Sequence, residues 1–600
     1  MPLRSSHTGL CRAFRTLGLL LALVAPAPAQ EAPARDVPED LNFANGLFRN
    51  RRYREAAAEY EGFLKGAAPG AFADEGRFGL ASARLFQGQY AEARRQFEAF
   101  LKAAPEHANA PTAWYRVGEA AFMLGDLPAA RVALETYTEK YPKHRFHETA
   151  WPYLGDVRLR LGALPEARQA YEKALADFPK GRLADRAKLG LGRALAQQGE
   201  TEAALKVLDD LARTGAADWV SKAWFHMGQV RSGAGEYAQA VEAYDTLEKL
   251  APQSSLLPEA RLRRAEALLK LDRAPEAEAS LRALATGDVA RNVGAQAAFA
   301  LGTAQLERGQ AAEALATLDD ALKRFENTPL APALLFRSAE AQQKLKQTDD
   351  ARARFLKASE IDPKDPWADV ALLHAARLAL EAGDKGAARS LATALPERFP
   401  RSALRADARL IEARVALDAG QPKEAIARLN ASLAEDKPEP ETAESQRYYL
   451  GLAYRADGQL EKAKELLDEL AAKSDAPVAA DAQLMVAQGH IDAKRFGDAV
   501  PVLKKYLSAK PPREYADYAL AHLARADLEL GQADEAAKAL DELATRFPKS
   551  KTLPPTRLRL AEAALGAKQY DRAAELFRQV VEADAPALRA RARSGLGWAL

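Results

Sequence analysis

Small and large apolar positions recur along this 600-residue chain with the spacing of paired helices. The stretch from Trp151 to Pro179 shows the unit in full, because two apolar faces of helical period meet at a break around Gly162. Pro179 cannot continue a helix and therefore marks where the second helix stops. One such pair cannot bury its own apolar face, so it needs neighbouring pairs on either side. The positions that form the two faces are Trp151, Leu154, Gly155 and Leu159, then Ala167, Tyr171 and Ala174.

One alanine keeps the same place in every unit and serves here as the reference alanine. Twelve positions before it the residue is always Gly or Ala, and four positions after it the residue is large and apolar in every unit except at Ala392. Small residues let two helices approach closely, and the large residue fills the groove beside them. We therefore predict an all-α fold, a right-handed α-solenoid of about fifteen helix-turn-helix units with a 37-residue period. The reference alanines are Ala56, Ala93, Ala130, Ala167, Ala204, Ala240, Ala277, Ala314, Ala351, Ala388, Ala425, Ala463, Ala499, Ala536 and Ala573.

These positions resemble the tetratricopeptide repeat family, whose pattern is Trp, Leu-Gly, Gly-x-Tyr, Ala, an aromatic residue and Pro. The fourth unit matches it as Trp151, Leu154-Gly155, Gly162-x-Leu164, Ala167, Tyr171 and Pro179. The period departs from the usual length of about 34 residues. The longer spacing, with joins such as Tyr141-Pro142-Lys143, is similar to two exported bacterial proteins of this family. They are the periplasmic coordinator that works with the Tol-Pal system and the lipoprotein subunit of outer-membrane-protein assembly.

The N-terminus has the pattern of a secretory signal peptide over residues 1–29. Arg4, Arg12 and Arg15 precede a short apolar core, and Ala27-Pro28-Ala29 offers a cleavage site before Gln30. The nine residues of that core are too few to span a bilayer. The lone Cys11 lies upstream of the core, so neither lipidation after cleavage nor a disulfide is expected. We expect export to the periplasm, or association with the outer membrane.

The remaining boundaries follow from the repeat. Residues 30–37 are predicted to be a linker, residues 38–589 one elongated solenoid, and residues 590–600 the first helix of a further, truncated repeat. The polar join at residues 435–441 is the expected hinge. Pro501, inside a second helix, predicts a local kink.

No residue pattern in the chain indicates catalysis. The sequence contains no P-loop, H-E-x-x-H or G-x-S-x-G motif, and we predict no cofactor and no enzymatic activity. His144, His147 and Glu148 could in principle hold a metal ion, but without a second cluster we interpret them as a solvated loop. His226, His374 and His522 share one repeat position and are interpreted as partly buried surface histidines.

Surfaces are therefore the place to look for function. In the family that the chain resembles, first helices line a groove that binds peptides or folded partners. The formal net charge of +2 and the mixed signs of the groove positions argue against nucleic acid, and a small molecule is not expected. The ordinary alternative is a solvated face without a partner. The candidate partner-binding residues are Phe86, Glu119, Met123, Asp156, Arg193, Arg377 and Arg414.

We expect a non-enzymatic scaffold that binds other proteins or peptides of the cell envelope. Two alternatives place further chain after Leu600. The solenoid would then belong to a polysaccharide-export protein with an outer-membrane β-barrel, or to a larger enzyme with a separate catalytic domain. Strand-like alternation or a catalytic motif beyond residue 600 would distinguish them.

Overall fold

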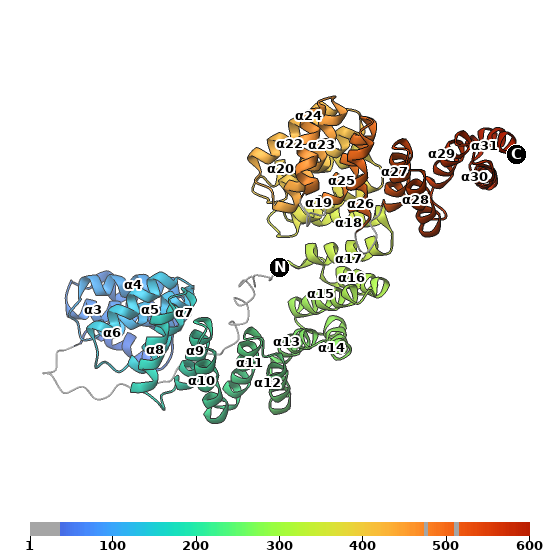
Figure 1. Ribbon diagram of the computed structural model, residues 1–600. Coiled ribbons are helices and arrows are strands. Elements are labelled where there is room, and N and C mark those ends of the chain that lie inside the picture. The colour runs from blue at the N-terminus through green and yellow to red at the C-terminus, as the bar shows by residue number, and fades with distance from the viewer. Residues whose placement is uncertain (1–36, 473–477, 509–514) are drawn as a thin grey trace. The chain divides into compact units, whose positions relative to one another are not determined.

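The computed structural model describes residues 37–472, 478–508 and 515–600, and every regular element within them is an α-helix. The predicted all-α fold is confirmed for these residues. The predicted signal peptide and all of the linker except Val37 lie outside the described residues. The chain divides into two compact units, Met1–Leu256 and Leu257–Leu600, and the predicted domain boundaries stay a prediction. In each unit the helices stack in pairs along the chain (Figure 1).

The first unit contains six helix pairs in its described residues. They are α1 (Glu39–Arg49), α2 (Tyr53–Gly66), α3 (Ala71–Phe86), α4 (Tyr90–Ala103), α5 (Ala110–Leu124), α6 (Leu127–Lys140), α7 (His147–Arg160), α8 (Leu164–Asp177), α9 (Ala184–Gln197), α10 (Thr201–Thr214), α11 (Ala217–Gly233) and α12 (Tyr237–Leu250). Gly215 is the C-cap of α10, in a repeat that lacks the terminal proline.

The second unit continues the same pairing with longer and shorter joins. Its helices are α13 (Leu257–Lys270), α14 (Ala274–Thr286), α15 (Arg291–Glu307), α16 (Ala311–Phe325), α17 (Ala331–Lys344), α18 (Thr348–Ile361), α19 (Ala368–Glu381), α20 (Lys385–Arg398), α21 (Arg405–Asp418), α22 (Pro422–Glu435), α23 (Pro440–Ala456), α24 (Leu460–Ala472), α25 (Ala479–Asp492), α26 (Phe496–Leu507), α27 (Ala516–Glu529), α28 (Ala533–Arg546), α29 (Leu553–Gly566), α30 (Tyr570–Glu582) and α31 (Pro586–Ala599). Pro501 lies inside α26, and the kink expected there stays a prediction.

The turn inside every pair has the same backbone conformation. The residue five positions before each reference alanine has a positive φ in all fifteen pairs, and in ten of them it is glycine. Glycine adopts this left-handed conformation without steric cost, so it closes the turn between the two helices. In the other five pairs a non-glycine residue adopts the same left-handed conformation, which is strained for a residue with a side chain. These residues are Arg51, Asp272, Lys346, Lys494 and Lys568.

The conserved spacing of small and large residues corresponds to a close contact between the helices of one pair. Ala167 is fully buried, and a Cβ atom added to Gly155 on α7 would lie 2.6 Å from the ring of Tyr171 on α8. Real atoms do not approach so closely, so only a glycine fits beneath that ring. Gly118, Gly192 and Gly302 meet Leu134, Leu208 and Leu318 in the same way. The small residue on the first helix therefore leaves room for the large side chain of the second helix, as the sequence predicts.

Odd-numbered helices pack more closely from repeat to repeat than even-numbered helices do. In the first unit α7 contacts α9 and α9 contacts α11, and in the second unit α19 contacts α21 and α21 contacts α23. Contacts between successive even-numbered helices are weaker. Because the closer layer of a stack lies on the inside of its curve, the odd-numbered helices line the inner side within each unit.

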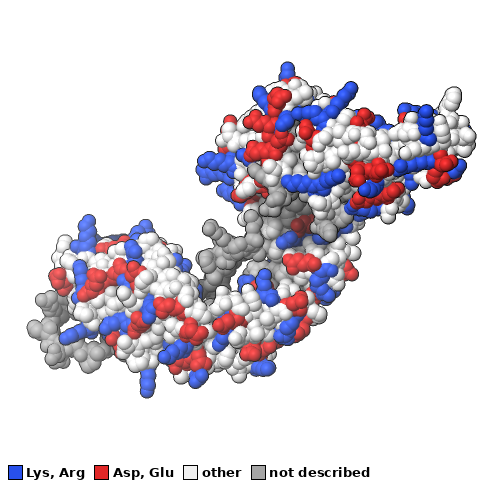
Figure 2. All heavy atoms as spheres, in the orientation of Figure 1, with Lys and Arg blue, Asp and Glu red and all other residues white. Residues whose placement is uncertain are grey.

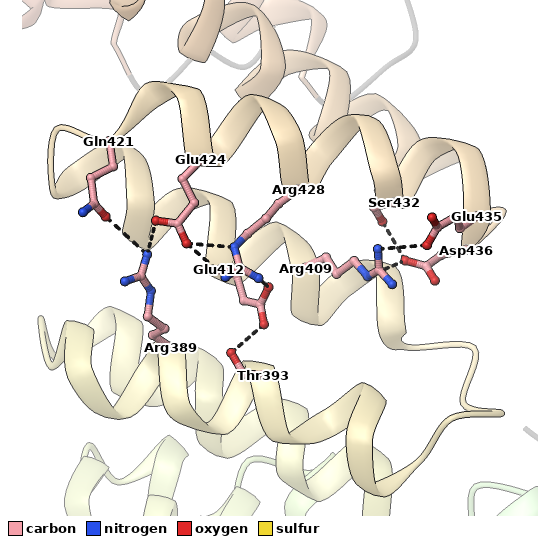
Figure 3. A network of polar contacts seen from close by, with 10 residues as sticks. All are labelled: Arg389, Thr393, Arg409, Glu412, Gln421, Glu424, Arg428, Ser432, Glu435 and Asp436. Atoms are coloured by element: carbon pink, nitrogen blue, oxygen red, sulfur yellow. Dashed lines mark hydrogen bonds and ion pairs between the residues drawn. The ribbon is translucent and has the colours of Figure 1, made fainter.

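A buried carboxylate lies at the start of the join predicted to be a hinge. Asp436 follows α22, and its side chain is only 3% exposed. It pairs with Nε of Arg409 at 3.0 Å and accepts a hydrogen bond from Ser432 (Figure 3). It also pairs with Nε of Arg405 at 3.2 Å. These contacts join α21 to the end of α22, the two helices of one repeat, so the hinge expected at residues 435–441 stays a prediction.

Candidate functional site

The predicted partner-binding residues all lie on odd-numbered helices, but they divide between the two units. Five lie in the first unit, on α3, α5, α7 and α9, and the other two lie on α19 and α21 of the second. We call the surface formed by the positions 18, 14 and 11 residues before each reference alanine, with the last turn of each odd helix, the odd-helix face. Its structure is clearest in the first unit.

Arg116 on α5 is the centre of a group of aromatic rings on this face. Its guanidinium carbon lies 5.7 Å from the ring centroid of Phe86, 5.4 Å from that of Tyr115 and 5.2 Å from that of Phe146. Nη1 of Arg116 donates to Oε2 of Glu119 at 2.5 Å. Rings and carboxylate together hold the guanidinium in place. Burial works against the charge, but the nearby carboxylate leaves the pKa of Arg116 above its ordinary value.

Apolar side chains border this group. The ring of Phe86 stacks on that of Tyr53 with centroids 4.9 Å apart, so Phe86 is partly buried and held in place. Met123, one turn beyond Glu119, is 49% exposed, and its neighbour Leu124 is 46% exposed. Met123 holds the same repeat position as Phe86, and its accessible thioether is suited to apolar contact with a partner on this face.

Asp156 on α7 is fully engaged within the protein. Its Oδ1 accepts a hydrogen bond from the hydroxyl of Tyr171 at 2.5 Å, and its Oδ2 accepts one from Nε of Arg186 at 2.6 Å. The guanidinium of Arg186 also lies 4.8 Å from the ring centroid of Tyr153. Burial raises the pKa of Tyr171 well above its ordinary value, and the Asp156 carboxylate raises it further. The contact joins three helices of two repeats.

Arg193 on α9 has no carboxylate partner within the described residues. Lys222 and His226 lie on α11, the next odd-numbered helix. Besides burial, the positive charges of Arg193 and Lys222 both act on the His226 imidazole and lower its pKa. Burial, followed by Arg193, lowers the pKa of His226 to about 4, so the ring is neutral at pH 7. Its Nδ1 is 2.7 Å from Oε1 of Gln229.

The second unit repeats parts of this arrangement. Arg377 on α19 donates to Asp407 at 2.7 Å, and the guanidinium of Arg414 on α21 lies 5.1 Å from the ring centroid of Tyr449. Arg337 on α17 pairs with Glu340 at 2.6 Å, as Arg116 pairs with Glu119. The guanidinium of Arg337 also lies 5.7 Å from the Phe299 ring centroid and 5.4 Å from that of Trp367.

Sequence reasoning missed Arg116, Tyr153, Arg186 and Arg337. Three of them occupy the position 14 residues before the reference alanine, which faces the same way as the candidate position 11 residues before it. Repeat counting would have found this second line of residues. The whole line, repeat by repeat where it is polar or aromatic, is Asn42, Arg116, Tyr153, His226, Arg263, Arg337, His374, Tyr449, His522 and Arg559.

The histidines at the join after α6 do not form a solvated loop as expected. His147 is buried, and its Nε2 lies 2.7 Å from the carbonyl oxygen of Tyr141. Nδ1 of His144 is 2.9 Å from the hydroxyl of Tyr137. Oε1 of Glu148 accepts from the backbone N–H of Arg182 at 2.6 Å. The two histidines hold this join against the end of α6, and Glu148 binds the next join, between α8 and α9.

The three histidines that share one repeat position, His226, His374 and His522, are partly buried, as the sequence predicts. Burial lowers the pKa of His226, His374 and His522 to about 4 in each case. Within residues 37–472, 478–508 and 515–600, no cluster of three or more His, Cys, Asp or Glu side chains could hold a metal ion. Over the same residues, no helix combines the length and apolar character needed to cross a bilayer.

The sequence pattern of the tetratricopeptide repeat matches most of the chain. The matched segments are residues 78–145, 153–218, 225–291, 299–366, 448–514, 518–550 and 556–585. The chain belongs to the tetratricopeptide repeat family. As in other members, its repeats make it a scaffold for protein–protein interaction. A search of curated proteins found no match to this tetratricopeptide repeat protein.

Solved structures share helical repeats with it at low sequence identity. The Cut9–Hcn1 hetero-tetramer of the APC/C aligns over 81% of this chain and 96% of that chain, with 14% identity and a TM-score of 0.35. Naa15/Naa10 bound to HypK-THB aligns over 93% and 99%, with 15% identity and a TM-score of 0.33. A tetratricopeptide repeat protein from Parabacteroides merdae ATCC 43184 aligns over 44% and 98%, with 15% identity and a TM-score of 0.35.

Proposed function

We propose that this tetratricopeptide repeat protein is a non-enzymatic scaffold, exported to the cell envelope, that binds proteins or peptides on its odd-helix face. The observation that carries this proposal is the group around Arg116. Aromatic rings, methionine and arginine are the side chains enriched at protein interfaces, and here they lie together on one face.

The arginine and its rings are already fixed in the free protein. Arg116 is bound by Glu119, and Phe86 is stacked on Tyr53. A partner would therefore immobilise few side chains on docking, which lowers the entropic cost of association. Met123 is the adaptable element beside them, because its unbranched side chain can follow the shape of a partner.

Substitution of Met123 by Asp tests the face directly. A charge placed there should repel an apolar partner, whereas Val132→Asp is a matched control because Val132 is 54% exposed on the even helix α6. Affinity capture from an envelope extract should recover the same proteins with wild type and Val132→Asp, and lose them with Met123→Asp. Recovery of the same proteins by both variants would show that the odd-helix face is not the binding surface.

Export has its own test. The support for it is the signal pattern at residues 1–29, with the cleavage site before Gln30. Expression of the full chain followed by N-terminal sequencing should give Gln30 as the first residue, in a fraction released by osmotic shock. An intact N-terminus in the cytoplasmic fraction would contradict export and leave the binding proposal standing.

A further inference from the structure

Neighbouring repeats are joined on the odd-helix face by a recurring pair of polar positions. The residue 11 before one reference alanine contacts the residue 18 before the next. Where both residues are polar and contact directly, they are complementary in charge or hydrogen bonding. The pairs are Asn45–Glu75 at 3.0 Å, Asp156–Arg186 at 2.6 Å and Arg377–Asp407 at 2.7 Å, and Glu562 contacts Arg591 in the same way at 2.5 Å.

One junction breaks this rule. Arg193 on α9 and Lys222 on α11 occupy these two positions, and no other junction in the sequence has a basic residue at both. Neither cation has an ion-pair partner within the described residues. Burial lowers the pKa of Lys222, and Arg186 lowers it further, against the opposing influence of Asp218. The junction therefore holds two basic side chains at the positions that form an ion pair in the Asp156–Arg186 and Arg377–Asp407 junctions.

The carboxylates nearby do not complete the pairing. Both oxygens of Asp156 are already bound, one by the hydroxyl of Tyr171 and the other by Arg186. Asp218, one turn before Lys222 on α11, lies beyond ion-pair distance. Arg186 is itself held by Asp156, so the positive charge that is left over belongs to Arg193 and Lys222.

The surroundings of the two cations fit a carboxylate side chain. The Nζ of Lys222 lies 4.2 Å from the ring centroid of Trp219, which holds the ammonium group in place. His226 is neutral at pH 7, and its Nδ1 lies within hydrogen-bond distance of Gln229. Its Nε2 makes no hydrogen bond within the described residues. A guanidinium can bind a carboxylate through two parallel hydrogen bonds, and an ammonium group can add a third.

We propose that Arg193 and Lys222 bind the Asp or Glu side chains of an acidic segment in a partner protein, which supplies the carboxylate that this junction lacks. The inference rests on the proposed function, because it assigns a partner chemistry to part of the same face. A nucleic acid fits less well, because its closely spaced phosphates would also meet Glu119 and Asp156 along the groove. The face visible in Figure 2 likewise shows interspersed signs rather than a continuous basic surface.

The test uses a fluorescein-labelled nonapeptide of alternating Glu and Leu with blocked termini, and a matched peptide in which Gln replaces every Glu. Fluorescence anisotropy with the full chain should show the Glu peptide binding at least about tenfold more tightly. Binding should weaken as salt is raised, since exposed charges are screened. Arg193→Gln and Lys222→Gln should each weaken the Glu peptide by about tenfold and leave the Gln peptide unchanged.

Two further variants separate binding from folding. Arg213→Gln removes an exposed arginine on the even helix α10 that is already paired with Asp209 at 2.8 Å, and it should bind the Glu peptide as wild type does. Arg193→Glu would restore an internal pair with Lys222, so it should keep or raise the melting temperature while abolishing Glu-peptide binding. A damaged fold cannot produce that combination.

Three results would overturn the inference. Equal binding of the Glu and Gln peptides would mean that the face binds peptides without selecting acids, and the proposed function would survive. No binding of either peptide would remove the acidic site, while envelope capture with Met123→Asp would still decide the scaffold proposal. Tighter binding of a labelled single-stranded oligonucleotide than of the Glu peptide would show that the ligand class is wrong.

Discussion

Arginine–carboxylate pairs occur in two regions of this protein, and their carboxylates differ in burial. On the odd-helix face of the first unit, Arg186 pairs with Asp156, whose side chain is 18% exposed. In the second unit, Arg405 and Arg409 pair with Asp436, whose side chain is almost entirely enclosed. The same chemistry thus joins two repeats on the face in one region and the two helices of one repeat in the other.

Figure 3 shows how far the enclosed network extends. Glu412 on α21 is buried, accepts a hydrogen bond from Thr393 on α20 at 2.7 Å and pairs with Arg428 on α22. The helices of two successive repeats are joined through this one carboxylate. Removing one member of a buried pair leaves the other uncompensated, whereas a solvated pair is replaced by water at little cost. The comparison therefore predicts large effects on stability at the interface and small ones on the face.

The largest effect is expected for Asp436→Ala. Arg405 and Arg409 would lose their shared partner, which should cost about 3 kcal/mol of local stability. Glu435→Ala is the matched control, because Glu435 is 66% exposed and its loss should cost less than about 0.5 kcal/mol. Hydrogen exchange of α21–α23 measures the local opening of a repeat array better than a global melt does. Equal exchange in the two variants would mean that Asp436 does not stabilise the contact between α21 and the end of α22.

Gly155→Ala tests the contact between the helices of one pair in the first unit. The new Cβ would overlap the ring of Tyr171, and the overpacking should cost about 1–3 kcal/mol. Gly62→Ala on α2 provides the control, because no atom lies within 4 Å of its added Cβ. There the substitution should stabilise the helix by about 0.5–1 kcal/mol. Thermal melting measures both, and shifts of the same sign would contradict the close contact.

His374 offers an intermediate test of burial. Its ring stacks on Phe355 in the second unit, and burial lowers its pKa from 6.5 to about 4. As the pH falls below 6.5 the unfolded chain takes up a proton that the folded chain refuses until about pH 4, so stability is lost across this window. His374→Phe should therefore reduce the loss of stability between pH 6.5 and 4, measured by urea unfolding. An unchanged dependence on pH would show that the ring is solvated.

The smallest effect is expected for Arg186→Gln on the face. The Arg186 side chain is 24% exposed and Asp156 keeps a second partner, so the loss should cost less than that of Asp436, about 1–2 kcal/mol. The hydroxyl of Tyr171 can still donate to Asp156, which keeps the helix contact in place. A melting temperature lowered as far as that of Asp436→Ala would show that the two regions do not differ as described.

Much of the fold followed from counting positions, because each repeat meets nearly the same neighbours. Ala167 and its equivalents are all buried, and the turn residues all have a positive φ, even where Asp272 or Lys346 replaces glycine. The candidate face could be placed in the same way, since a helical period assigns residues to faces. What counting could not supply was which side chains pair. Arg116 escaped notice because an arginine in a helix carries no signal of the rings that will surround it.

The amino-acid sequence by itself determined the repeat, its helices and its turns, because those depend on interactions within about forty residues that recur along the chain. Only the tertiary structure decided that Asp436 is enclosed beside Arg405 and Arg409, and that Arg193 and Lys222 are left without carboxylates within the described residues. Both outcomes depend on which side chains are brought together from different helices. Whether a charge is enclosed, paired or left over depends on the neighbours that packing gives it, and composition alone does not reveal them.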